Sequence, residues 1–142
     1  IIDTYFAKYK RVREFMEELK ELASKQEYVE TMHGRKVFLP NISHSNFQVR
    51  SAAERTAINA PIQGTAADII KIAMINIKEW LIRENIHNVF MIMQVHDELV
   101  FEIDDSDIHR YGDKISDLMA SAEKLSVPLL VNTFSGSNWQ ET

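Results

Sequence analysis

The chain has 142 residues, of which 45% are hydrophobic, and a formal net charge of −5. This length fits one domain or a large piece of one, and the apolar content is enough for a hydrophobic core. The absence of cysteine excludes disulfides and thiolate metal sites. No apolar run suggests a membrane helix and nothing at the start resembles a signal peptide, so we expect a cytoplasmic protein with no membrane partner. The acidic charge argues against a general nucleic-acid-binding protein, so any such contact must come from a local cationic patch or from residues beyond these.

The first expected element is an amphipathic helix over about residues 2–23. Its apolar residues recur at steps of three and four, which is the spacing of one helical face. They are Ile2, Phe6, Tyr9, Val12, Met16, Leu19 and Ala23. Because the sequence starts at Ile1 within this helix and has no initial methionine, we expect the chain to be part of a longer polypeptide.

A β-hairpin is predicted next, between Tyr28 and Leu39, where strand-like residues flank a short turn. The turn is expected at His33-Gly34-Arg35, because glycine adopts turn conformations that other residues resist. Pro40 should end the second strand.

Two helices separated by a proline are expected after the hairpin. The first covers about residues 43–59, and Pro61 should break or kink it, because proline lacks an amide donor and restricts the residue before it. The second begins near Gly64, where Thr65 and Asp68 have the spacing of a capping box. Its apolar stripe predicts a largely buried helix.

The second half of the sequence predicts another hairpin, a further helix and a last strand. The β-rich runs 89–95 and 98–103 lie on either side of His96-Asp97, which is the expected turn. Asp104-Asp105-Ser106 are N-terminal signals for a helix, and residues 128–131 have the composition of a strand. The predicted fold is therefore α+β, with helices packed on an antiparallel sheet.

The adjacent acids Asp97 and Glu98 interrupt an apolar run and are the most informative pair in the chain. Ionised carboxylates there are costly unless something offsets their charge, and Mg²⁺ prefers carboxylate and phosphate oxygens. Consecutive side chains of a strand point to opposite faces, so both acids can face one site only if the strand turns there. We expect Asp97 to be the direct Mg²⁺ ligand and Glu98 an outer contributor. The alternative is a plain hairpin turn with exposed acids.

Two-metal phosphoryl transfer places its ions ~3.5–4 Å apart, and one pair of carboxylates rarely holds both. A further acid is therefore needed, and the sequence offers no comparable one, because Asp68 has a capping position and residues 104–105 start a helix. His96 is a candidate contact for a substrate phosphate, sugar or base, with a structural donor as the alternative. Gln94 alternates with His96 along the strand, so the two share a face.

A second group of polar residues lies on the helix before the proline. Arg55 and Asn59 are four apart and share a helical face, which Gln63 extends if the bend at Pro61 is modest. With Arg50, these side chains offer donors without negative charge, and the edges of the DNA minor groove present mostly acceptors. The alternative is an ordinary polar helix face on which Arg50 pairs with the acid four residues later.

Several segments resemble DNA polymerase family A, the bacterial DNA polymerase I type. Residues 93–100, Met-Gln-Val-His-Asp-Glu-Leu-Val, resemble the third polymerase motif of the family, and residues 50–71 are similar to the segment just upstream of it. Residues 28–40 resemble the fingers hairpin, and Ser137-Asn-Trp139 resembles the C-terminal end. The resemblance covers essentially the whole chain in the order of the family.

The resemblance implies an enzyme, a DNA-directed DNA polymerase (a nucleotidyltransferase) of DNA replication and repair. On primer–template DNA, a primer 3′-hydroxyl attacks the α-phosphate of a dNTP, pyrophosphate leaves, and two Mg²⁺ ions assist. Asp97 takes the place of the metal-binding aspartate of the family, with Glu98 beside it, and His96 falls near the primer terminus. The resemblance also implies a bacterial, nucleoid-associated location.

The resemblance further implies that the polar helix face binds DNA. Arg55, Asn59 and Gln63 correspond to residues that contact the primer–template minor groove, and Arg50 falls where a DNA-contacting arginine lies. This agrees with the row of donors seen in the sequence and favours the DNA-binding interpretation of that row.

Parts of the family pattern are missing from these residues, including the first motif with its aspartate, the dNTP-binding helix and the thumb. The chain resembles the C-terminal part of a polymerase domain, with about residues 1–60 as fingers-side helices and hairpin and about 61–142 as a partial palm. We expect the missing N-terminal part of the same polypeptide to complete the Mg²⁺ site, and the isolated chain to be inactive.

Two other functions compete with the polymerase. The dipeptide His96-Asp97 suggests a metal phosphohydrolase, but that class needs further His and Asp ligands spread over helices, which the other histidines do not supply. A non-catalytic DNA-binding relative is the second alternative, and the intact acidic pair argues against it.

Overall fold

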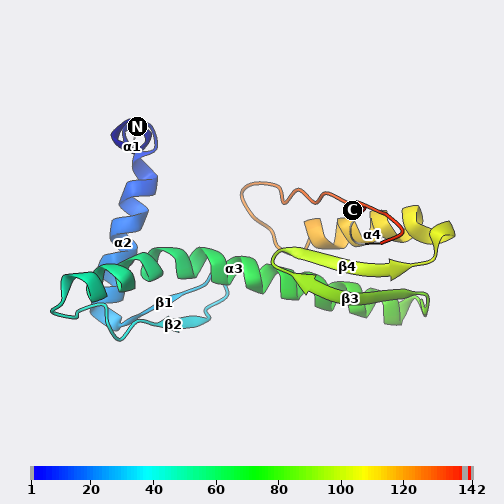
Figure 1. Cartoon of the computed structure of the whole chain (residues 1–142), viewed down its shortest axis with the longest axis horizontal. Helices are drawn as coiled ribbons and strands as arrows, with labels where there is room; N and C mark the ends of the chain where they lie inside the picture. The colour runs from blue at the N-terminus through cyan, green and yellow to red at the C-terminus, as the bar shows by residue number, and fades with distance from the viewer. Residues whose placement is uncertain (1, 139–140, 142) are drawn as a thin grey trace. The chain divides into compact units, whose positions relative to one another are not determined.

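The computed structural model describes residues 2–138 and 141, and Figure 1 shows its helices and strands in chain order. The fold is α+β, as the sequence predicted, and its strands form two separate antiparallel pairs. The chain divides into two compact units at Ala66/Ala67, and each unit is described by itself. No helix among the described residues combines the length and apolar content needed to cross a membrane.

The first helical segment is interrupted, which corrects the single helix expected from the sequence. Helix α1 covers Ile2–Lys8 and helix α2 covers Lys10–Gln26, with Tyr9 in a non-helical conformation between them. The predicted apolar stripe is buried only at Leu19 and Ala23, and α1 buries none of its residues. Because packing of an apolar face supplies most of the stability of a helix, the uncovered first part has little to keep it continuous.

The first hairpin is confirmed. Strand β1 (Tyr28–Glu30) pairs antiparallel with strand β2 (Lys36–Phe38), and Gly34 in the loop has the positive φ of 78° that favours glycine. The hairpin contributes to the hydrophobic core of the first unit. That core consists of Leu19, Ala23, Val29, Leu39, Ile42, Ala53 and Ala57.

Helix α3 runs without a break from Phe47 to Arg83, so the two helices expected here are one. It begins beside Asn46, whose side-chain oxygen accepts from the backbone N–H of Gln48 at 2.8 Å, as a cap should. A proline within a helix costs about 3 kcal/mol. Burial of apolar residues on both sides of Pro61, in the cores of the two units, offsets that cost. The expected capping box is also wrong, because Thr65 lies inside α3 and no helix begins there.

The second unit contains the second predicted hairpin, which is confirmed. Strand β3 (Val89–Val95) pairs antiparallel with strand β4 (Glu98–Ile103), with an irregularity between Met91 and Met93. A 3-10 turn, η1 (Asp105–Asp107), then leads into helix α4 (Ile108–Ala120), close to the predicted helix start. These elements enclose a core with the end of α3. It consists of Ile77, Trp80, Leu81, Val89, Tyr111 and Ile115.

The last predicted strand is wrong. Residues 128–131 form no strand, and Leu130 is 86% exposed. An isolated apolar run forms a strand only when it finds an edge to pair with, and β3 and β4 pair only with each other among the described residues. The resemblance at Ser137-Asn-Trp139 extends outside the described residues, because Trp139 is not among them.

Candidate functional site

The acidic pair lies at the tip of the second hairpin. Val95 pairs with Glu98, so His96 and Asp97 alone make the turn between the strands. His96 has a positive φ of 54° at the first turn position, where hairpins favour glycine. The chain therefore reverses at the acidic pair, which was the condition for both carboxylates to face one site. Asp97 and Glu98 are exposed.

The turn is supported by one side chain from β3. The amide nitrogen of Gln94 donates to the carbonyl oxygen of His96 at 3.1 Å. The sequence placed these two residues on one face but did not assign Gln94 this supporting role. Because the contact uses the backbone of His96, it leaves the exposed imidazole available for a ligand.

The carboxylates at the tip fit part of a Mg²⁺ site. Neither carboxylate has a hydrogen bond or an ion pair to another described residue, so the side-chain oxygens are available to a cation. Hard carboxylate oxygens suit Mg²⁺, which commonly keeps water and substrate phosphates as its other ligands. Within residues 2–138 and 141, no group of three or more His, Cys, Asp or Glu side chains could hold a metal ion.

The polar row on α3 lies in the first unit. Arg55, Asn59 and Gln63 follow one another at steps of four and are all exposed. Because α3 continues through Pro61, Gln63 stays in line with the other two, which meets the condition set by the sequence. The guanidinium of Arg55 donates to the hydroxyl of Ser51 at 3.1 Å, a support that the sequence analysis did not identify, although the four-residue spacing was its signal.

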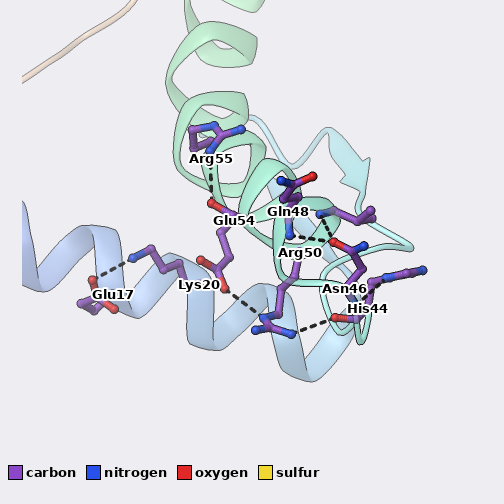
Figure 2. Close-up of polar contacts among 10 residues, drawn as sticks. Glu17, Lys20, His44, Asn46, Gln48, Arg50, Glu54 and Arg55 are labelled. Atoms are coloured by element: carbon purple, nitrogen blue, oxygen red, sulfur yellow. Dashed lines mark hydrogen bonds and ion pairs between the residues drawn. The ribbon is translucent and has the colours of Figure 1, made fainter.

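Arg50 is held differently from the row, as Figure 2 shows. Its guanidinium donates to the carbonyl oxygen of His44 at 2.9 Å and lies 3.8 Å from the carboxylate of Glu54. The side chain is half-buried and ties the loop before α3 to the first turns of the helix. Arg50 therefore has a structural role in this chain, and its contact with DNA stays a prediction.

The chain is similar to bacterial polymerases over its whole length. The family model for DNA polymerase family A matches residues 1–141. DNA polymerase I of Pseudomonas aeruginosa is 48% identical over 140 residues, which cover 99% of this chain and 15% of that protein. DNA polymerase I of Mycobacterium tuberculosis is 45% identical over 138 residues, covering 97% of this chain and 15% of that protein.

A solved structure has the same fold. The polymerase domain of Pol1 from M. smegmatis, in complex with DNA primer-template and dNTP, matches with a TM-score of 0.85 and 41% identity. The match covers 90% of this chain and 22% of that chain. This chain thus spans about 15% of the length of the curated relatives named above. The family match includes the polar row, the hairpin tip and almost every other residue, and the chain belongs to DNA polymerase family A.

Proposed function

We propose that the polypeptide containing this chain carries out template-directed DNA synthesis in bacterial replication and repair. The observation that carries this proposal is the pair Asp97-Glu98 at the tip of a tight hairpin, exposed and without a cationic partner among the described residues. A carboxylate pair presented in this way suits divalent metal binding, and the family of the chain supplies the reaction class.

In this proposal Asp97 binds Mg²⁺ directly and Glu98 contributes from the outer side. Bound Mg²⁺ would stabilise the charge that develops on the attacking and leaving oxygens during phosphoryl transfer. The chain positions the two carboxylates through the β3–β4 pairing and the support of Gln94. A further aspartate from the rest of the polypeptide would complete the two-metal site.

The polar row on α3 would hold the primer–template. Arg55, Asn59 and Gln63 present donors along one exposed helix face, and the minor groove presents acceptors that do not distinguish A·T from T·A. Such a row can follow a duplex without reading its sequence, which a replicating enzyme requires. His96 would lie near the primer terminus, and the incoming dNTP would be held largely by residues outside this chain.

The two compact units support a division of this chain into a fingers part and a palm part. We assign about residues 1–60 to the fingers side and about 61–142 to a partial palm, close to the division at Ala66/Ala67. A polymerase with chromosomal DNA as its substrate would work in the bacterial cytoplasm, associated with the nucleoid.

The test is Asp97→Asn in the full-length polymerase. The substitution keeps the shape of the side chain and removes its charge, so primer extension should fall by at least about 100-fold while primer–template affinity changes little. Asp105→Asn is the matched control, because it removes one exposed carboxylate from the same unit at the start of η1. Unchanged synthesis by Asp97→Asn would refute the role of Asp97 as a metal ligand.

A non-catalytic DNA-binding relative is the second candidate. Its expected result differs, because binding would persist while both the parent protein and Asp97→Asn fail to extend a primer. The metal phosphohydrolase is no longer supported, since the family match accounts for the His96-Asp97 dipeptide.

A further inference from the structure

The helical turn that carries Gln63 is fastened to the loop of the first hairpin through the hydroxyl group of Thr65. The Oγ1 of Thr65 donates to the carbonyl oxygen of Pro61 at 2.6 Å. The Oγ1 of Thr65 also accepts a hydrogen bond from the backbone N–H of Met32 at 2.9 Å, across 33 residues of sequence. Gln63 lies between Pro61 and Thr65, so this hydroxyl both closes the turn around Gln63 and ties it to the loop.

Pro61 makes this turn depend on side chains more than the rest of α3. Proline supplies no N–H, so the carbonyl of Ala57 loses its ordinary helical partner. A threonine hydroxyl that bonds the carbonyl four residues earlier tends to bend a helix. The path of α3 between Asn59 and Thr65 is therefore set partly by the contact with the loop and less by the backbone ladder alone.

The loop side of this contact is well ordered by its own bonds. The backbone N–H of Thr31 donates to the carbonyl oxygen of Arg35 at 2.9 Å, and the N–H of Gly34 donates to that of Thr31 at 2.9 Å. The N–H of Arg35 also donates to the buried hydroxyl of Thr31 at 3.2 Å. The backbone of Met32 is therefore held from both sides and gives Thr65 a fixed point.

A glycine allows the helix to approach this loop closely. A Cβ added at Gly64 would lie 2.6 Å from Cγ2 of Thr31, closer than such atoms approach each other. Thr31 is only 5% exposed, so its methyl group has little room to move away. Gly64 and Thr65 together make a joint between α3 and the hairpin loop.

We propose that Thr65 is a positioning residue for the DNA-contacting face of α3. Its hydroxyl sets the direction in which Gln63 presents its amide donors to the minor groove. The proposal rests on the proposed function of that face. Thr65 does not touch DNA in this scheme, and acts through the geometry of the turn.

The first test compares Thr65→Val with Thr65→Ser in the full-length polymerase. Valine keeps the shape of threonine and removes the hydroxyl, so the dissociation constant for primer–template should rise about 3- to 10-fold. Serine keeps the hydroxyl and should remain within about 2-fold of the parent protein. Parent-like binding by Thr65→Val, or equal losses in the two variants, would overturn the proposal.

A double-mutant cycle with Gln63→Ala separates positioning from general stability. If Thr65 acts through Gln63, then Gln63→Ala weakens binding in the parent protein but has much less effect in the Thr65→Val background. Ile42→Val is the control, because it disturbs the core of the same unit away from the joint, and its effect should add to that of Gln63→Ala. Additive losses for Thr65→Val and Gln63→Ala would overturn the positioning role.

The cycle also distinguishes this proposal from the one it rests on. If Gln63→Ala binds primer–template as the parent protein does, then the proposed DNA face itself is wrong, and the positioning role is lost with it. If Gln63→Ala weakens binding and Thr65→Val does not, the DNA face stands and only the positioning role is refuted.

Discussion

Both hairpins of this chain are antiparallel strand pairs, but the loop that joins the strands is held by more hydrogen bonds in the first than in the second. The loop between β1 and β2 is bonded within itself and to α3 through Met32 and Thr65. At the tip between β3 and β4, Gln94 donates to the backbone of His96, and the two carboxylates have no partner among the described residues.

The difference separates a hairpin loop that is held by hydrogen bonds of this chain from a tip whose charges it leaves unpaired among the described residues. In the proposed function, the first hairpin holds a row of donors in line on α3. The tip of the second hairpin presents charge that a bound cation would stabilise.

The strongest test of this comparison is the activity of the 142-residue chain alone. We expect no primer extension and only weak Mg²⁺ binding, because the tip offers two carboxylates and the two-metal reaction needs a further acid. Primer extension and a Mg²⁺ titration of the purified chain measure both. Co-expression with the remainder of the polymerase is the control, and robust extension by the chain alone would contradict the expected shared metal site.

Much of the fold followed from the sequence where local pattern and tertiary packing agree. Both hairpins were predicted because strand-like residues flank a short turn, and Gly34 has the positive φ expected of it. The break expected at Pro61 did not occur, because burial on both sides outweighs the local cost of a proline. The strand at residues 128–131 failed because pairing is not encoded in the run itself.

The sequence predicted the candidate site residues but not the side chains that hold them in place. The acidic pair and the donor row were visible because charge in an apolar run and four-residue spacing are local signals. The roles of Thr65 and Gln94 depend on bonds to backbone atoms, and backbone partners leave no trace in residue identity. For Arg50 the sequence predicted a contact with DNA, whereas in this chain its guanidinium donates to the carbonyl oxygen of His44 and pairs with Glu54.

The next effect in size is expected for Glu98→Gln in the full-length polymerase. If Glu98 contributes from the outer side of the metal site, synthesis should fall about 10-fold, which is less than for Asp97→Asn. Steady-state primer extension at several Mg²⁺ concentrations measures this, and higher Mg²⁺ should recover part of the loss. A loss equal to that of Asp97→Asn would mean that both acids bind the metal directly.

A smaller effect is expected at the fixed loop, for Gly34→Ala. A Cβ at Gly34 meets nothing within 4 Å, so the cost is only that of a positive φ, about 1 kcal/mol. Hydrogen exchange of the loop amides should then be about 5-fold faster, because local opening becomes easier. Gly112→Ala in α4 is the control, and it should slow the hydrogen exchange of the amides of that helix. An added Cβ has open space there and alanine favours a helix.

The smallest effect is expected at His96, and it tests whether the positive φ of this residue at the β3–β4 turn serves DNA synthesis. His96→Gly and His96→Ala both remove the imidazole, but only glycine accepts the φ of 54° without cost. We expect the glycine variant to be more stable than the alanine variant by about 1 kcal/mol in urea unfolding. Primer extension should fall to the same extent in both, because each variant loses the imidazole that we propose to lie near the primer terminus. If the alanine variant is much less active than the glycine variant, the backbone of the turn matters more than the side chain, and His96 serves mainly to orient Asp97.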